Sequence, residues 1–202
     1  MRQLIYGTLG IAFSFIVATA AVAQQGGRIR GQIAQASGDG FVVKTREGAT
    51  VTAKIDDKTR VGALVKASLA DIKTDSFIGI AGMPAADGRI VAFSIHIFMP
   101  AQRGVVPDRH GPWDARPNST MTNAYVGSAA KSADGEVLTV KYKDGEKQVI
   151  VTPETVIAAA APGSKDELKA GAGVVIFGYE KQGDGAVLVR SMYVGRGVTP
   201  AM

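Results

Sequence analysis

The stretch IRGQIAQASGDGFVVKTREG at residues 29–48 is followed, about 96 residues later, by YVGSAAKSADGEVLTVKYKDG at residues 125–145. Both stretches contain short apolar runs, and both are divided by Asp-Gly or Glu-Gly dipeptides. Alternation of apolar and polar residues predicts half-buried strands, and such dipeptides favour the tight turns of β-hairpins. The sequence therefore predicts two copies of one small β unit.

The two copies share their landmarks over residues 29–98 and 125–194. In chain order these are Gly31 and Gly127, Asp39-Gly40 and Asp134-Gly135, Glu47-Gly48 and Asp144-Gly145, Thr59 and Thr155, Ile72-Lys73 and Leu168-Lys169, Gly82 and Gly178, and Asp87-Gly88 and Asp184-Gly185. A short helical turn is expected near residues 68–72 and again near 164–168, where Ser164 and Glu167 have the spacing of a capping box.

Five strands with a helical turn between the third and fourth are the order of an OB-type barrel. An open five-stranded meander would give the same pattern, but closure is favoured because so small an open sheet exposes two edges. The predicted fold class is all-β, with two tandem five-stranded OB-like barrels, each with a short helical turn, joined by a Pro-rich connector. The barrels are assigned to residues 29–98 and 124–198, and the connector to residues 99–123.

The connector has a composition of its own. Its four prolines argue against a regular helix or strand pairing, and it holds the only tryptophan of the chain, Trp113. A bare tether would be rich in glycine and serine. We therefore expect this segment to lie ordered across the two barrels. The prolines are Pro100, Pro107, Pro112 and Pro117.

The N-terminus indicates export. A charged start, an apolar run over residues 4–22 and the ending Ala21-Val22-Ala23 are typical of a secretory signal over residues 1–23. Residues 24–28 are then a leader. The alternative is a retained membrane anchor, because the run approaches the length that spans a bilayer. We expect cleavage, no transmembrane span in the mature chain, and a periplasmic or secreted location.

Composition excludes several classes of site. The chain has no cysteine, which excludes disulfides, lipoprotein anchoring, thiolate metal sites and cysteine nucleophiles. The net charge of +5 is scattered along the sequence, so nucleic acid is not an expected partner. The basic balance favours an anionic glycan or lipid as partner, or else serves only solubility. An unknown envelope protein is the other partner that we expect.

The repeat signature resembles a bacterial domain of unknown function that occurs in exported proteins, frequently in tandem. The resemblance rests on the turn and core positions of residues 29–98 and 125–194. The segment from Arg103 to Ala124 resembles one subgroup of such tandem proteins. This resemblance implies an OB-like small β-barrel fold and export, and it carries no activity, cofactor or catalytic residue.

The sequence predicts a non-enzymatic binding or scaffolding module at the bacterial cell envelope. Two barrels with an ordered basic connector could form a shared groove, and tryptophan and arginine are frequent binding anchors. The alternative is that the same side chains only hold the two barrels together. The candidate ligand-binding residues are Arg103, Arg109, Trp113 and Arg116.

A second hypothesis is a periplasmic Cu(I) or Ag(I) site, since thioether and imidazole ligands favour Cu(I). Its candidate ligands are His96, Met99, His110 and Met121, an inventory similar to that of small copper-chaperone OB-folds. The alternative places His96 toward solvent on the last strand of the first repeat. An enzyme is not expected, because no nucleophile elbow, zinc motif or phosphate loop occurs in the sequence.

Overall fold

The computed structural model describes residues 27–133 and 135–200, and this part of the chain is all-β. The predicted signal segment and residues 24–26 of the leader lie outside the described residues. Twelve strands are joined by hydrogen bonds into one sheet system. The strands are β1 (Ile29–Ser37), β2 (Gly40–Thr45), β3 (Thr50–Lys54), β4 (Arg60–Lys66), β5 (Phe77–Pro84), β6 (Ile90–Ile97), β7 (Arg109–Pro112), β8 (Thr120–Ser132), β9 (Gly135–Tyr142), β10 (Gly145–Pro162), β11 (Gly173–Lys181) and β12 (Val187–Arg196).

Both helical turns expected from the sequence are present as short 3₁₀ helices. They are η1 (Leu69–Asp71) and η3 (Lys165–Glu167). In η3 the Ser164 side chain accepts a hydrogen bond from the Asp166 N–H, while the Ser164 N–H donates to Glu167 Oε1 at 2.8 Å. The capping-box prediction is therefore confirmed.

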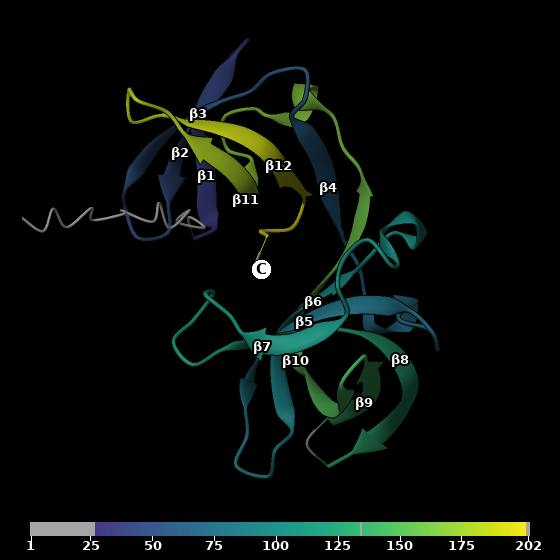
Figure 1. Ribbon diagram of the computed structural model, residues 1–202. Coiled ribbons are helices and arrows are strands. Elements are labelled where there is room, and N and C mark those ends of the chain that lie inside the picture. Colours follow the sequence, from purple (N-terminus) through teal and green to yellow (C-terminus); the bar gives the residue numbers. More distant parts are fainter. Residues whose placement is uncertain (1–26, 134, 201–202) are drawn as a thin grey trace, which may run out of the picture.

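One closed barrel is built from both ends of the chain. Strands β1, β2 and β3 of the first repeat form a meander, and β11 and β12 of the second repeat complete it. β11 pairs antiparallel with β1, for example Ile176 with Ile29, and β12 pairs parallel with β3, for example Val187 with Ala53. We call this set the first ring. In Figure 1 it is the upper group, where purple and blue strands meet yellow and green ones.

The second ring is the corresponding circuit of pairings among β8, β9, β10, β6 and β5. Here the three-stranded meander comes from the second repeat and the hairpin from the first. β10 pairs parallel with β6, for example Val149 with Ile90, and β5 pairs antiparallel with β8. The second ring is the lower, teal and green group in Figure 1. β4 and β7 belong to neither ring.

The expected arrangement of two tandem barrels, each made from one repeat, is not confirmed. Each set of strands instead combines the first three strands of one repeat with the last two of the other. The physical reason is that the two repeats present equivalent strands in the same register. Leu188 lies beside Lys54 in the first ring as Val91 lies beside Ile150 in the second, so local patterns cannot state which hairpin closes which meander.

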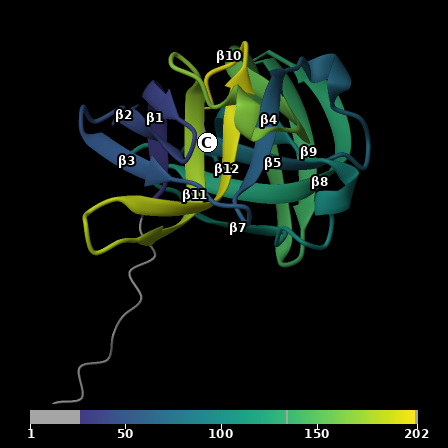
Figure 2. The same cartoon turned by 90° about the horizontal axis from the view of Figure 1, so that it is seen from above.

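The strands that cross between the rings, β4 and the second half of β10, link each meander by strand pairing to the hairpin of the other repeat. β4 leaves the first ring and pairs in parallel with the end of β12, and the second half of β10 does the same along β6. β4 and β10 then pair antiparallel with each other, with Leu64 opposite Ala160, its equivalent one repeat spacing later. The two halves of the molecule are thus related by an approximate two-fold axis at this pair. Figure 2 shows β4 beside β12 from above.

Gly31 and Gly127 do not occupy equivalent positions in the two repeats. The irregularity in β1 falls at Ala34, between Ile33 and Gln35, whereas that in β8 falls at Gly127. Gly127 is therefore the equivalent of Ala34 and not of Gly31. The two opening strands and their turn differ in length, so matching the glycines by sequence spacing shifts the register.

The repeated threonines bend the chain at equivalent points. Thr59 Oγ1 donates to the Val189 carbonyl at 2.7 Å, and Thr155 Oγ1 donates to the Ala92 carbonyl at 2.7 Å. Each hydroxyl also accepts the N–H three residues earlier, at 3.0 Å. Both threonines are buried. These hydrogen bonds hold the bends where the chain leaves one ring for the crossing strand.

Replacing Thr155 with valine should lower the free energy of unfolding by about 1–3 kcal/mol, because the shape is kept while a buried carbonyl and a buried N–H lose their partner. Chemical denaturation measures this. The control is Thr52→Val on the exposed face of β3, where a change within about 0.5 kcal/mol is expected. Equal effects of the two substitutions would contradict the assigned role of Thr155.

Candidate ligand pocket between the two rings

The two rings meet through a pair of equivalent side chains, His96 of β6 and Tyr193 of β12. Their ring centroids lie 5.1 Å apart. Phe98 lies 4.6 Å from His96 on one side, and Phe177 lies 5.3 Å from Tyr193 on the other. His96 is only 1% exposed. The interpretation that placed His96 toward solvent is therefore wrong, because the outer face of β6 is covered by the first ring.

The environment of His96 keeps its imidazole neutral. Neither ring nitrogen has a hydrogen-bond partner within residues 27–133 and 135–200. Burial lowers the pKa of His96 to about 3, since a charged imidazolium would lose its hydration without gaining a counter-ion. At neutral pH this side chain therefore acts as an apolar aromatic wall of the interface.

A pocket of about 240 Å³ opens beside this contact. Its walls come from both rings and from the connector, so neither ring alone forms it. Four aromatic side chains line it, together with smaller apolar groups, two amides and two guanidinium groups. The aromatic residues are Phe98, Trp113, Phe177 and Tyr193. The others are Val106, Pro107, Met121, Val175, Gln102, Asn123, Arg28 and Arg109.

The connector is ordered along the pocket by specific hydrogen bonds. The turn η2 (Pro100–Gln102) places the Gln102 side chain so that its Nε2 donates to the Tyr193 hydroxyl at 2.7 Å. Asn123 Nδ2 donates to the Pro107 carbonyl at 3.1 Å. Burial raises the pKa of Tyr193, against the opposing effect of Gln102. The expected ordered connector is thus present.

The expectation that the prolines prevent strand pairing in the connector is wrong. β7 pairs with β8 over four positions, from Arg109 opposite Asn123 to Pro112 opposite Thr120. Proline is tolerated because β7 is an edge strand in the described part of the chain, and Pro112 is its last residue.

Two arginines share one carboxylate at the rim of the pocket. Arg30 Nη2 lies 2.6 Å from Asp114 Oδ1, and Arg28 Nη1 lies 3.4 Å from Asp114 Oδ2. Burial raises the pKa of Asp114, but the hydrogen bonds from Arg30 and from the Arg28 N–H outweigh it and hold that pKa below its usual value. The Arg28 guanidinium also lies 3.6 Å from the centroid of the Trp113 ring.

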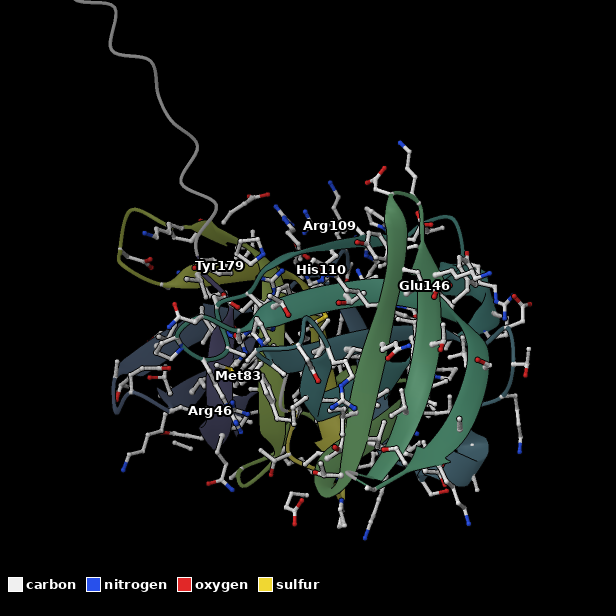
Figure 3. All side chains as sticks on the ribbon, turned by 90° about the horizontal axis from the view of Figure 1, so that it is seen from below. Arg46, Met83, Arg109, His110, Glu146 and Tyr179 are labelled. Atoms are coloured by element: carbon white, nitrogen blue, oxygen red, sulfur yellow. The ribbon has the colours of Figure 1, made fainter. Side chains whose placement is uncertain are left out.

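The sequence-predicted binding residues divide into two groups. Arg109 and Trp113 line the pocket, and Figure 3 shows Arg109 on β7 next to His110. Arg103 instead forms an ion pair with Asp75 at 3.0 Å. Arg116 covers the ring of Phe93, with 4.0 Å from Cζ to the centroid. These last two arginines hold the connector to the second ring.

The structure does not bring the four proposed copper ligands together. Gly79 is paired with His96 on one side and with Asn123 on the other, and Asn123 is paired in turn with Arg109. The side chains of His96, Asn123 and Arg109 therefore share one face of the sheet. His110 follows Arg109 and lies on the opposite face, where its Nδ1 is 2.8 Å from Thr122 Oγ1.

The two methionines of that hypothesis also differ in position. Met121 lines the pocket, whereas Met99 precedes the turn η2 and donates its N–H to Gln102 Oε1. Among the residues that the structure describes, no three His, Cys, Asp or Glu side chains gather as a metal site would require.

Arg28, Gln102, Phe177 and Tyr193 were not predicted as site residues. Arg28 falls in the leader, and the aromatic residues fall within strands whose local patterns resemble core positions. These residues could have been predicted only with knowledge of the exchange of hairpins, because the exchange places the end of β12 and the start of β1 beside the connector. No local sequence pattern indicates that exchange.

Comparisons with protein-family models, curated proteins and solved structures gave no match for this chain. Among the described residues, none of the helices has the length and apolar character needed to cross a membrane.

Proposed function

We propose that this protein is an exported, non-enzymatic binding module of the bacterial cell envelope, and that it holds its partner in the pocket between the two rings. The proposal treats each ring as an OB-like barrel and the connector as the element that closes the pocket. The observation that carries it is the lining, in which four aromatic side chains and two arginines converge from three parts of the chain.

The chemistry of this lining favours recognition over catalysis. Aromatic walls supply apolar contact area, and amides and guanidinium groups fix orientation. Gln102 and Asn123 are already held by hydrogen bonds to Tyr193 and Pro107, so the pocket is formed before a partner arrives. A preformed pocket reduces the ordering cost of binding.

An exposed aromatic side chain points to the same conclusion. Phe177 is 45% exposed although it lies in a strand of the first ring and lines the pocket. Covering such a side chain with a partner contributes to affinity roughly in proportion to the apolar area removed from water. Phe177 thus offers apolar area that a partner can cover without disturbing the core.

The test compares what immobilised protein variants retain from a bacterial envelope extract. Deleting residues 103–118 would remove β7, so single substitutions are sharper. Phe177→Ala and Arg109→Ala should each lose the species that the wild type retains. The control Val105→Ala changes a connector residue that is 76% exposed and outside the pocket, and it should retain them. Retention of the same species by all variants would refute the proposal.

A further inference from the structure

We infer that the pocket between the rings takes a small organic anion with a flat apolar body, such as an aryl carboxylate. Its charged group lies at the guanidinium groups of Arg28 and Arg109, and its body lies against Phe177 and Trp113. This inference rests on the proposed function and names the ligand class of the same pocket.

The positive charge of the pocket favours an anionic ligand. Its lining contains two arginines and no carboxylate. The carboxylate of Asp114 is not part of the lining, and it is already shared by Arg28 and Arg30. With Arg109, these groups sum to two positive charges in excess. A ligand anion is favoured because hydrogen bonds between guanidinium and carboxylate are charge-assisted and can be bidentate.

The positive charges crowd one another, which a ligand anion would relieve. Burial lowers the pKa of Arg28, against the effect of Asp114, and the neighbouring charges of Arg30 and Arg109 lower it further. The nearby Arg46 behaves alike, since burial lowers its pKa first and the charge of Arg30 adds to this. An arginine stays charged in these conditions, so the excess positive charge persists at neutral pH.

The size and the aromatic lining of the pocket favour a small, flat ligand. Its volume of about 240 Å³ is below the range of about 300–1,000 Å³ that is usual for drug-sized ligands. Four of the lining side chains are aromatic, and aromatic rings favour a flat body over a branched one. Gly79 lets two lining side chains pack against the backbone, because a Cβ there would lie 3.0 Å from Asn123 Oδ1 and 3.1 Å from Phe98 Cζ.

The single tryptophan gives a direct readout. Trp113 is the only tryptophan of the chain, so the indole N–H region of a ¹⁵N correlation spectrum reports on one residue of the pocket. The chain without residues 1–23 is titrated with 2-naphthoate and, separately, with the neutral and nearly isosteric 2-naphthamide. We expect 2-naphthoate to shift the Trp113 signal with an affinity about tenfold higher than that of the amide.

Substitutions then separate the two halves of the ligand. Arg109→Gln should weaken 2-naphthoate by about tenfold and leave 2-naphthamide unchanged. Phe177→Ala should weaken both. The matched control is Arg60→Gln, an exposed arginine of β4 that lies outside both the pocket and the connector, and it should change neither.

Each remaining outcome overturns the inference. Equal affinity for the acid and the amide would remove the anionic ligand class and leave the pocket as a binding site. An effect of Arg60→Gln as large as that of Arg109→Gln would do the same. Absence of any Trp113 shift at millimolar concentrations of both probes would overturn the aryl anion outright, whereas the envelope-extract comparison decides separately whether the pocket binds a partner.

Discussion

Replacing His96 with phenylalanine should remove a large part of the acid sensitivity of the folded state. The pKa of His96 in the folded protein is about 3, whereas an imidazole in an unfolded chain titrates near pH 6.5. Between these values the unfolded state binds more protons than the folded state, so stability falls as the pH falls. The loss from this group is about 1.4 kcal/mol per pH unit.

The sign and window of this effect are specific. The contribution of neutral His96 is complete above about pH 6.5 and is lost progressively as the pH approaches 3. Between pH 6.5 and 5 the wild type should lose about 2 kcal/mol through His96, in a range above the titration of carboxylates such as Asp114, whose pKa is lowered. The phenylalanine variant should lack this loss, and at pH 7 it should be as stable as the wild type or more so, because two unpaired buried nitrogens are removed.

The measurement is chemical denaturation of both proteins at several pH values between 7 and 5. The matched control is His110→Phe, since the chain has two histidines. Burial and the charge of Lys147 lower the pKa of His110, but this side chain is half-buried and bonded to Thr122, so its removal should change the pH dependence less. Identical slopes for the wild type and His96→Phe would show that His96 is not buried as described.

Replacing Gly62 with alanine should destabilise the junction between the rings. Gly62 of β4 pairs with Tyr193, and a Cβ at Gly62 would lie 2.4 Å from Tyr193 Cε1 and 2.6 Å from Cδ1. The tyrosine ring has little freedom to move, since it lies between His96 and Phe177 and its hydroxyl is bonded by Gln102. Overpacking of this kind costs about 1–3 kcal/mol.

Thermal or chemical unfolding measures this loss. The matched control is Gly111→Ala, another strand glycine, where no atom of the described residues lies within 4 Å of an added Cβ. Combining Gly62→Ala with Tyr193→Ala should reduce the effect of the alanine at 62, because the group it strikes is gone. Additive effects in the double variant would contradict the contact.

The sequence predicted the strands better than their partners. Alternation and Asp-Gly turns predicted the hairpins correctly, and Ser164 with Glu167 predicted the turn η3. Strand β4 is not predictable from the local pattern, because Gly62 and the small residues around it do not alternate, and the same holds for the alanine-rich end of β10. Pairing between distant strands depends on complementary surfaces that no local pattern encodes.

The pocket residues could be predicted only in part. The connector stood out by its Trp113 and its arginines, and Trp113 and Arg109 do line the pocket. Arg103 and Arg116 share that composition, yet each is held by a contact with the second ring. The burial of His96 could not be predicted, because β6 has apolar residues on both faces and the side chains that cover its outer face belong to the other repeat.

The exchange of hairpins between the two repeats is tested most directly by disulfide trapping, since the natural chain has no cysteine. Lys54 of β3 lies beside Leu188 of β12, and neighbouring strands about 4.8 Å apart place paired residues within disulfide reach. Barrels formed by one repeat each would instead place Lys54 beside Val91, because Val91 occupies the corresponding position in β6.

Two double variants, Lys54→Cys with Leu188→Cys and Lys54→Cys with Val91→Cys, are oxidised at low protein concentration, and disulfide-linked peptides are identified by mass in the monomer fraction. The exchanged arrangement predicts a crosslink within one chain for Lys54→Cys with Leu188→Cys, and none for the pair at 54 and 91. A crosslink between positions 54 and 91, without one between 54 and 188, would contradict the exchange and the pocket that depends on it.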